Sequence, residues 1–486
     1  MALVLSQAVS FAAVLTAEGG LLVWGSQRHG MLGLGHGEEE WGETLLHPTP
    51  LGGVGAPVAG DEGGDAAHAF DHDPLVMVSA GIFHVAAVTD GGDVWVWGAD
   101  LRGMLGPIPR EDGQPPIPRE DGEPDFRNVP VRWDRSGCGG SPVVMVACGR
   151  LFTLALTRAG HVWRCGRPWY EADDLGHTGA PTRIAGVEGV AMVAAGQQAC
   201  LAVAADGRLW SWGSHVLCPD DNDDDLQSVA PEVENTPRVL GPAAFGGSAV
   251  RFVAMGLSHG LLVTAAGGLW VWGDGPSPCM GLGHIVDPPR NFRRPRCVGS
   301  PEAPQFAGAR VHMAAFGTGH MVVLTEDGAV WTCGMGSHGV LGHGTLNWCW
   351  EPTRIPQAFF AGRAVACVTA GREMSMAVTN DGVLYTWGRG PLGHGVSGTL
   401  LVPTRVATTL PPGARVARTC AAPRAHMLAF CMGANARLGA DGCAFATASN
   451  DALSRIGAAA QGLSGAYLHM GEGLLRLVGV RRRVAA

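Results

Sequence analysis

The chain has 486 residues, a net charge of −9 and only 16% charged residues. This composition argues against direct nucleic-acid binding, because neutralising a phosphate backbone takes clustered Lys and Arg. No segment offers 18 uncharged apolar residues in a row, so the sequence predicts no membrane span.

The chain contains no lysine, and all of its 34 Lys-plus-Arg residues are arginine. We interpret this bias as the product of a very GC-rich genome, such as that of a high-GC microbe or a large DNA virus. The functional alternative is that no side chain is available for acetylation or ubiquitin attachment. The bias therefore indicates more about the source than about a mechanism.

The 13 cysteines are an odd number, and no Cys-x-x-Cys occurs. Those within apolar runs are expected to be small buried hydrophobic residues in a reducing compartment. These are Cys148, Cys165, Cys200, Cys333 and Cys367. Their spacing predicts no metal site. We expect an intracellular protein, cytoplasmic or nuclear, with a virion as the alternative if the source is a large DNA virus.

The N-terminal apolar stretch, including Val9–Leu15, lacks the basic region of a secretory signal. It matches the first strand of a repeat that continues along the chain. Seven short apolar strands end in Trp-Gly or Cys-Gly, at Trp24, Trp97, Cys165, Trp212, Trp272, Cys333 and Trp387. Self-similarity at this period indicates a repeat architecture.

The unit that ends at Trp97-Gly98 shows the whole pattern. It opens with Ser-Ala-Gly, His84 follows, and an apolar strand leads to Asp90-Gly91, which is typical of a tight hairpin turn. Leu-Gly-His turns come after most closures, and they begin at Leu34, Leu175, Leu282, Leu341 and Leu392. Short strands separated by glycine turns are typical of a propeller blade.

These elements together resemble the regulator-of-chromosome-condensation family of seven-bladed β-propellers, over roughly residues 5–431. The resemblance rests on the Ala-x-Gly-x-x-His opening, the Asp-Gly hairpin, the Trp-Gly closure and the Leu-Gly-His-Gly turn, in that order. It implies a propeller fold. It also implies two activities of the founding member, guanine-nucleotide exchange on a Ran-like GTPase and docking on chromatin through a basic N-terminal tail. This chain is acidic and begins in its first strand, which lowers the expectation of a chromatin role.

We therefore expect an all-β protein, with a seven-bladed propeller of short antiparallel blades over residues 1–431. Ala421–Phe430 matches one more opening hairpin, so both termini are predicted to combine in one blade and close the ring. A degenerate eighth blade at Asp441–Phe445 is the alternative. Residues 432–486 are expected to form a closing segment and a short, partly helical tail.

Function is usually carried by loops on a rigid scaffold, so insertions into the repeat are the informative places. They are expected near residues 38–74, 99–141, 214–248 and 285–308. The second contains a tandem duplication, Pro-Ile-Pro-Arg-Glu-Asp-Gly starting at Pro107 and again at Pro116. A neutral copying event in a tolerant loop explains it most simply, and the functional alternative is a repeated contact.

The insertions supply the candidate interaction residues. The duplicated loop offers Arg110 and Arg119, the third insertion offers Asp220, Asp221, Asp223, Asp224 and Asp225, and the fourth offers Arg290, Arg293, Arg294 and Arg296. The acidic run lacks the alternating carboxylates, bend and distal Glu of a calcium loop, so it is interpreted as a solvated loop or a contact for a basic partner. The arginine cluster either meets an acidic surface or balances neighbouring acidic loops.

His84, His259, His320 and His426 recur at one repeat position, which favours a structural role such as bonding a neighbouring carbonyl. Equivalent positions on a ring lie on different blades and do not converge on a metal. Signatures of hydrolases, kinases and metalloenzymes are absent from the sequence. We therefore assign no catalytic, cofactor-binding or metal-binding residues, and expect no cofactor.

Three functions follow from this reading. The first is a non-enzymatic scaffold that binds a macromolecule, with a protein as the expected partner, through its loop faces. The second is guanine-nucleotide exchange on a Ran-like GTPase, which the family resemblance implies without assigning residues. The third is a structural subunit that assembles with copies of itself, for example in a viral particle.

Overall fold

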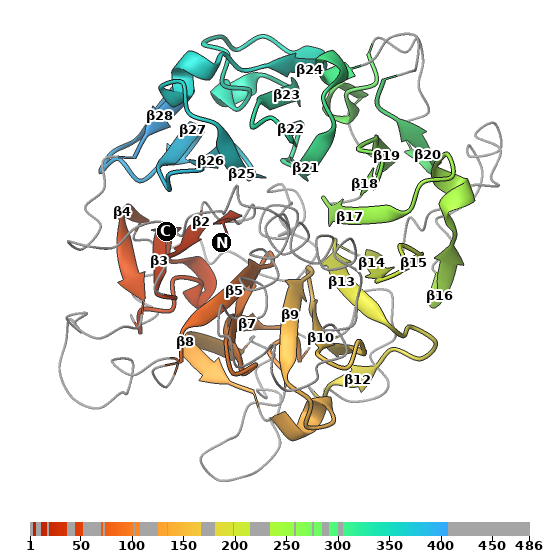
Figure 1. Ribbon diagram of the computed structural model, residues 1–486. Helices are drawn as coiled ribbons and strands as arrows, with labels where there is room; N and C mark the ends of the chain where they lie inside the picture. Colours follow the sequence, from red (N-terminus) through yellow and green to blue (C-terminus); the bar gives the residue numbers. More distant parts are fainter. Residues whose placement is uncertain are drawn as a thin grey trace, which may run out of the picture.

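Seven four-stranded sheets stand around a central axis in the computed structural model (Figure 1). Consecutive strands of each sheet are antiparallel neighbours, so the predicted seven-bladed β-propeller is confirmed. The structure describes residues 3–5, 11–16, 19–35, 44–51, 70, 73–101, 103–106, 125–133, 135–166, 180–197, 199–213, 234–256, 259–274, 277–283, 291–299 and 305–406.

Each blade is named here in chain order, from its inner strand to its outer strand. Blade 1 holds β1 (Leu3–Leu5), β2 (Phe11–Leu15), β3 (Leu21–Ser26) and β4 (Thr44–Leu51). Blade 2 holds β5 (Leu75–Ala80), β6 (His84–Thr89), β7 (Val94–Asp100) and β8 (Asp125–Arg132). Blade 3 holds β9 (Val143–Cys148), β10 (Phe152–Thr157), β11 (Val162–Gly166) and β12 (Thr182–Arg183). Blade 4 holds β13 (Val190–Ala195), β14 (Ala199–Ala204), β15 (Leu209–Gly213) and β16 (Glu234–Leu240).

The remaining blades follow the same order. Blade 5 holds β17 (Val250–Met255), β18 (His259–Thr264), β19 (Leu269–Asp274) and β20 (Asn291–Cys297). Blade 6 holds β21 (Val311–Phe316), β22 (His320–Thr325), β23 (Val330–Gly334) and β24 (Cys349–Arg354). Blade 7 holds β25 (Val365–Ala370), β26 (Met374–Thr379), β27 (Leu384–Pro391) and β28 (Ser397–Arg405).

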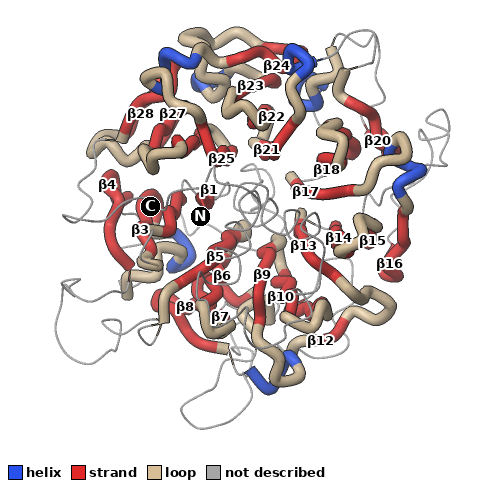
Figure 2. Tube along the Cα trace, in the orientation of Figure 1, coloured by secondary structure: helices blue, strands red, loops and turns tan. Residues whose placement is uncertain are grey.

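Short 3-10 helices lie in the connections outside the sheets (Figure 2). They are η1 (Arg28–Gly30), η4 (Arg135–Cys138), η7 (Pro242–Phe245), η8 (Ser277–Met280), η9 (Gln305–Gly308), η10 (Ser337–Gly339) and η11 (Gln357–Phe360). Within the described ranges, no helix is long and apolar enough to cross a membrane.

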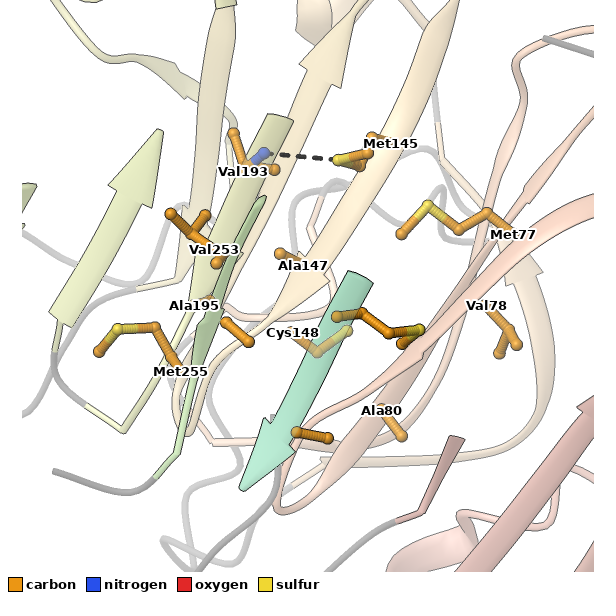
Figure 3. Close-up of a cluster of buried hydrophobic side chains, with 14 of the residues drawn as sticks. Met77, Val78, Ala80, Met145, Ala147, Cys148, Val193, Ala195, Val253 and Met255 are labelled. Carbon is orange, nitrogen blue, oxygen red and sulfur yellow. Dashed lines mark hydrogen bonds between the residues drawn. The ribbon is translucent and has the colours of Figure 1, made fainter. Parts of the chain in front are cut away.

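Small side chains dominate the inner strands, because the blades converge toward the axis. Figure 3 shows part of this packing, where Ala80, Ala147 and Ala195 lie among the methionines and valines of β5, β9, β13 and β17. The amide of Val193 donates a hydrogen bond of 3.4 Å to the sulfur of Met145, which links blades 3 and 4. The five cysteines that the sequence predicted to be buried, Cys148, Cys165, Cys200, Cys333 and Cys367, are buried.

The hairpin turns between second and third strands form as the Asp-Gly pairs predict, with one shift. In blade 6, Gly328 takes the left-handed conformation at φ +80° directly after Asp327. In blade 2 the left-handed residue is Gly92, at φ +84°, and its amide donates to the carbonyl of Thr89. The turn therefore centres one residue later than Asp90-Gly91 indicated, because two glycines follow the aspartate.

All four strands of blade 1 come from residues 3–51. Blade 1 closes the ring directly on blade 7. The indole Nε1 of Trp24 donates to the carbonyl of Pro391 at 3.1 Å, and the amide of Gly395 donates to the carbonyl of Leu46 at 3.0 Å. Residues 407–486, which include the predicted closing hairpin, the alternative eighth blade and the tail, lie outside the described part of the chain.

Each of the four insertion windows contains the outer strand of its blade: β4, β8, β16 and β20. These strands escaped the sequence analysis because they are rich in Pro and charged residues, as in Asn291–Cys297. Edge strands tolerate such residues, since one side of their backbone faces solvent. The true connections are therefore shorter than the windows suggested.

Candidate binding face

The antiparallel order of each blade gives the ring two different faces. Turns from the second to the third strand and links to the next blade lie on one side, which we call the hairpin face. Turns from the first to the second strand and connections from the third to the fourth lie on the other, the loop face. On the hairpin face the turns have four residues in blades 2 to 7, as at 90–93. On the loop face the third connections range from five residues, 392–396, to twenty-four, 101–124.

Buried histidines join neighbouring blades below the loop face. Nε2 of His320 lies 2.9 Å from the hydroxyl of Ser375 in blade 7, and this hydroxyl donates to the carbonyl of Val340 at 2.9 Å. Nε2 of His84 lies 2.7 Å from the hydroxyl of Thr153. Because the hydroxyl of Ser375 gives its proton to the carbonyl, its oxygen accepts from Nε2–H of His320. Burial lowers the pKa of both His84 and His320 to about 3, so the rings are neutral at pH 7.

The predicted structural role of the repeated histidines is confirmed for this pair, although a hydroxyl stands between the ring and the carbonyl. The chain of contacts also explains the Gly-x-x-His spacing. A side chain at Gly317 would collide with the ring of His320, so this position must be glycine. In blade 5 the edge of His259 instead packs on Phe316, with ring centroids 4.3 Å apart. His426 lies outside the described residues.

Two of the closing tryptophans, Trp97 and Trp387, bind the turns of the preceding blades. Nε1 of Trp97 donates to the carbonyl of Met31 at 2.8 Å, and Nε1 of Trp387 donates to the carbonyl of Val340 at 2.8 Å. Each indole also covers the glycine of a Leu-Gly turn, such as Gly342 at φ +73°. Trp97 and Trp387 therefore hold the bases of the loops in blades 1 and 6.

The two Cys-Gly closures keep the same packing by different means. Where blade 2 meets blade 3, next to Cys165, the indole of Trp133 covers Gly106, and its Nε1 donates a hydrogen bond to the carbonyl of Leu105. Where blade 5 meets blade 6, Met321 lies opposite Cys333 in the sheet, and its side chain reaches Gly281 in the turn of blade 5. Larger neighbours thus fill the space that an indole occupies elsewhere.

The Leu-Gly-His histidines fasten the loops to their own blades. Nε2 of His343 lies 2.9 Å from the hydroxyl of Thr332, which donates to the carbonyl of Leu341 at 2.8 Å. His394 makes the same contact with Thr386 at 2.9 Å. Burial lowers the pKa of His343 and His394, so these rings also act as neutral hydrogen-bonding groups. The loop face is consequently a set of variable connections on firmly held bases.

Most of the candidate interaction residues fall outside the described part of the chain: Arg110, Arg119, Asp220, Asp221, Asp223, Asp224, Asp225 and Arg290. The other three belong to β20. Arg294 is exposed and Arg296 is half-buried. Arg293 lies in the strand between them and Phe292. The structure therefore places only the end of the basic cluster.

An exposed apolar group on blade 6 was missed by the sequence analysis. Leu346 is 56% exposed and Trp348 is 51% exposed, and both lie in the connection 335–348 on the loop face. The available signal was Trp-Cys-Trp at 348–350, where the outer strands of blades 2, 4 and 5 begin with Asp, Glu or Asn. In the described ranges, no group of three or more His, Cys, Asp or Glu side chains is arranged to hold a metal ion.

A model of the RCC1-like domain matches residues 55–429 of this sequence. The chain belongs to the RCC1-like domain family. It is 30% identical over 331 residues to the Ultraviolet-B receptor UVR8 of Arabidopsis thaliana, covering 66% of each chain. It is 28% identical over 459 residues to the Secretion-regulating guanine nucleotide exchange factor of Mus musculus, covering 88% of this chain and 85% of that protein.

Other RCC1-like relatives are similar over a smaller part of their length. The chain is 31% identical over 316 residues to the E3 ubiquitin-protein ligase HERC2 of Homo sapiens, covering 63% of this chain and 6% of the ligase. Among solved structures, human WBSCR16 gives a TM-score of 0.61 at 23% identity, covering 80% of this chain and 95% of that one. Prp20p of Saccharomyces cerevisiae gives a TM-score of 0.60 at 20% identity, covering 82% of this chain and 88% of that one. These two likenesses show the fold.

Proposed function

We propose that this protein is a non-enzymatic propeller that binds a protein partner on its loop face. The asymmetry of the two faces carries this proposal. Six of the seven third connections on the loop face have fourteen residues or more, whereas only one of the six links between blades on the hairpin face does, and the turns of that face keep four residues in blades 2 to 7. Variable loops on a rigid scaffold are where binding residues concentrate.

The neutral histidines and closing indoles support the same proposal, because they hold the loop bases in place before a partner arrives. A preorganised surface loses less conformational entropy on binding than a mobile one. The central residues of this framework, Trp97, Trp387, His84 and His320, are fully buried. They therefore stabilise the face without contacting the partner.

A capture experiment tests the proposal. Since the chain has no lysine, an amine-reactive biotin labels only its N-terminal amine. The protein immobilised through this single site is exposed to an extract of its native source, and captured proteins are identified by mass spectrometry. We expect a partner whose capture is lost when the loop-face connection 214–233 or 107–124 is shortened.

The matched control shortens residues 52–69, which belong to a link on the hairpin face. This variant is expected to capture the partner as the wild type does. Loss of capture in the control together with retention in both loop-face variants contradicts the proposed binding face. Capture of no protein by the wild type contradicts the proposed function itself.

The alternative function is guanine-nucleotide exchange on a Ran-like GTPase. The specific support is the similarity to the mouse secretion-regulating exchange factor, which covers 88% of this chain. Exchange needs no covalent chemistry, only a surface that opens the nucleotide site of the GTPase. The test mixes the chain with a panel of Ran-like GTPases loaded with fluorescent GDP. Exchange predicts accelerated release for at least one of them, and unchanged release across the panel rejects it.

A further inference from the structure

Two tryptophans lie side by side on the outer edge of blade 6. The rings of Trp348 and Trp350 are 6.5 Å apart at an interplanar angle of 51°. Trp348 is the last residue of the connection 335–348, and Trp350 is the second residue of β24. Among the described residues, only four large hydrophobic side chains are mostly exposed, and Trp348 is the single aromatic one. A tryptophan so exposed on a rigid edge is a common centre of protein recognition.

The connection that carries Trp348 is firmly held. The amide of Gly344 donates to the carbonyl of Leu401 in blade 7 at 2.9 Å, and His343 bonds Thr332 at its start. At its end, the carbonyl of Asn347 lies so close to Gly336 that any side chain there would collide with it. The exposed ring of Trp348 therefore projects from a fixed base, beside the half-buried ring of Trp350, and loses little freedom on binding.

The chemistry of this edge fits a proline-rich strand with a basic residue. Side-by-side aromatic rings bind the flat apolar surface of prolines in an extended segment. Glu351 follows Trp350 and is exposed, and no ion pair is recorded for its carboxylate among the described residues. It is a suitable acceptor for an arginine that follows the prolines.

The chain itself contains such a ligand twice. Pro-Ile-Pro-Arg begins at Pro107 and again at Pro116, within the connection between β7 and β8 of blade 2. Both ends of this connection belong to blade 2, whereas β24 lies on the far side of the ring (Figure 1). A contact within one chain would need the segment to cross the whole loop face, but a second copy can approach the edge of blade 6 freely.

We propose that residues 107–124 of one copy dock on Trp348 and Trp350 of another. Because the segment is anchored in blade 2 and the site belongs to blade 6, the contact is head-to-tail and leaves a free site at one end of an assembly and a free segment at the other. Because each site accepts one repeat at a time, the tandem duplication gives the segment two ways to bind the same site. This inference rests on the proposed function, since Trp348 belongs to the loop face.

A complementation experiment tests it. Trp348→Ala keeps the segment but removes the site, and deletion of residues 107–124 keeps the site but removes the segment. The deletion leaves a connection longer than the five residues that join β27 to β28, so the strand pair can still close. Light scattering is expected to show that the wild type associates with rising concentration, that each variant alone is monomeric, and that their mixture forms dimers and nothing larger.

A synthetic peptide of residues 107–124 provides a second measurement. It is expected to change the tryptophan fluorescence of the deletion variant, and to bind Trp348→Ala at least about tenfold more weakly. Val239→Ala is the control, because Val239 is 51% exposed on blade 4 and should leave association unchanged. Monomeric wild type, or a mixture of the two variants that stays monomeric, overturns the proposal. If the wild type is monomeric but still captures a partner, this inference fails and the proposed function stands.

Discussion

At the scale of single residues, the repeat positions have distinct physical tasks. The sequence alone predicted that the recurring histidines are structural, and His320 shows why the prediction succeeds: repetition on a ring prevents convergence on a site. It could not reveal the partner, because Ser375 is 55 residues away and on another blade. The exposed Trp348 was missed although a signal was present, because Trp-Cys-Trp at 348–350 stands where the outer strands of blades 2, 4 and 5 begin with a polar residue.

Gly317 gives the first prediction at this scale. Gly317→Ala places a methyl group against the ring of His320, and we expect a loss of about 1–3 kcal/mol in the free energy of unfolding. Urea denaturation measures it. Gly241→Ala is the matched control, because no atom lies within 4 Å of the added carbon. Equal effects of the two substitutions would contradict the proposed clash.

The pH dependence of stability gives the second prediction at this scale. The pKa of His84 and His320 is about 3 in the folded protein and near 6.5 in the unfolded chain. Below pH 6.5 the unfolded state therefore binds protons that the folded state excludes. Stability is full above pH 6.5 and is lost as pH falls toward 3, by about 1.4 kcal/mol per pH unit and per histidine.

His320→Gln isolates this contribution, because its amide can still donate to Ser375. The variant should be less stable than the wild type at pH 7, and its stability should fall less steeply between pH 6.5 and 4.5. Carboxylates titrate in both proteins, so their effect cancels in the comparison. Parallel curves for the two proteins would show that His320 is not excluded from protonation.

At the scale of elements, the sequence predicted the two strands on either side of each hairpin turn and missed the outer strand in the four insertion windows. The inner strands are continuous apolar runs between glycine turns, whereas the outer strands, such as Asn291–Cys297, carry charges and proline. The compensation at the seams was equally hidden. Nothing in the sequence sets Trp133 apart. The structure shows that its indole fills the space over Gly106 that a closing tryptophan would fill if position 165 were not cysteine.

This compensation gives the third prediction. The residue of blade 6 that is equivalent to Trp133 is Ile355. At that position the turn glycine, Gly342, is covered by the closing Trp387 of blade 7 and by the smaller Ile355. Trp133→Ile should therefore leave a cavity and cost roughly 2–4 kcal/mol, and Cys165→Trp should overpack the seam. The double variant should recover part of the loss, as a thermal denaturation series will show. Additive losses would mean that the two side chains do not share one space.

At the scale of the whole molecule, the ring closes between its first and last described blades. Blades 1 and 7 are not consecutive in the described sequence, and the seam between them is held by packing and by contacts such as that of Trp24 with Pro391. The sequence anticipated a closure by both termini, but it could not show that residues 3–51 already supply four strands. Leu3–Leu5 carries too little pattern to be identified as a strand.

The closing seam gives the fourth prediction. Trp24→Phe removes the indole bond to Pro391 at the seam between the first and last described blades, and Trp387→Phe removes its equivalent between blades 6 and 7, which the described link 355–364 connects. Hydrogen–deuterium exchange should accelerate more in β2 and β3 of the first variant than in β26 and β27 of the second. The reverse order would show that the ring does not open at blade 1.

The central claim is that the loop face binds the partner, and a hydrogen–deuterium exchange footprint of the complex tests it most directly. The captured partner is mixed with the full chain, and amide protection is compared between the faces. We predict protection in the loop-face connections, including 335–348 and 392–396, with the hairpin turns unchanged. Protection confined to turns such as 90–93 and 326–329, on the opposite face, would contradict the claim.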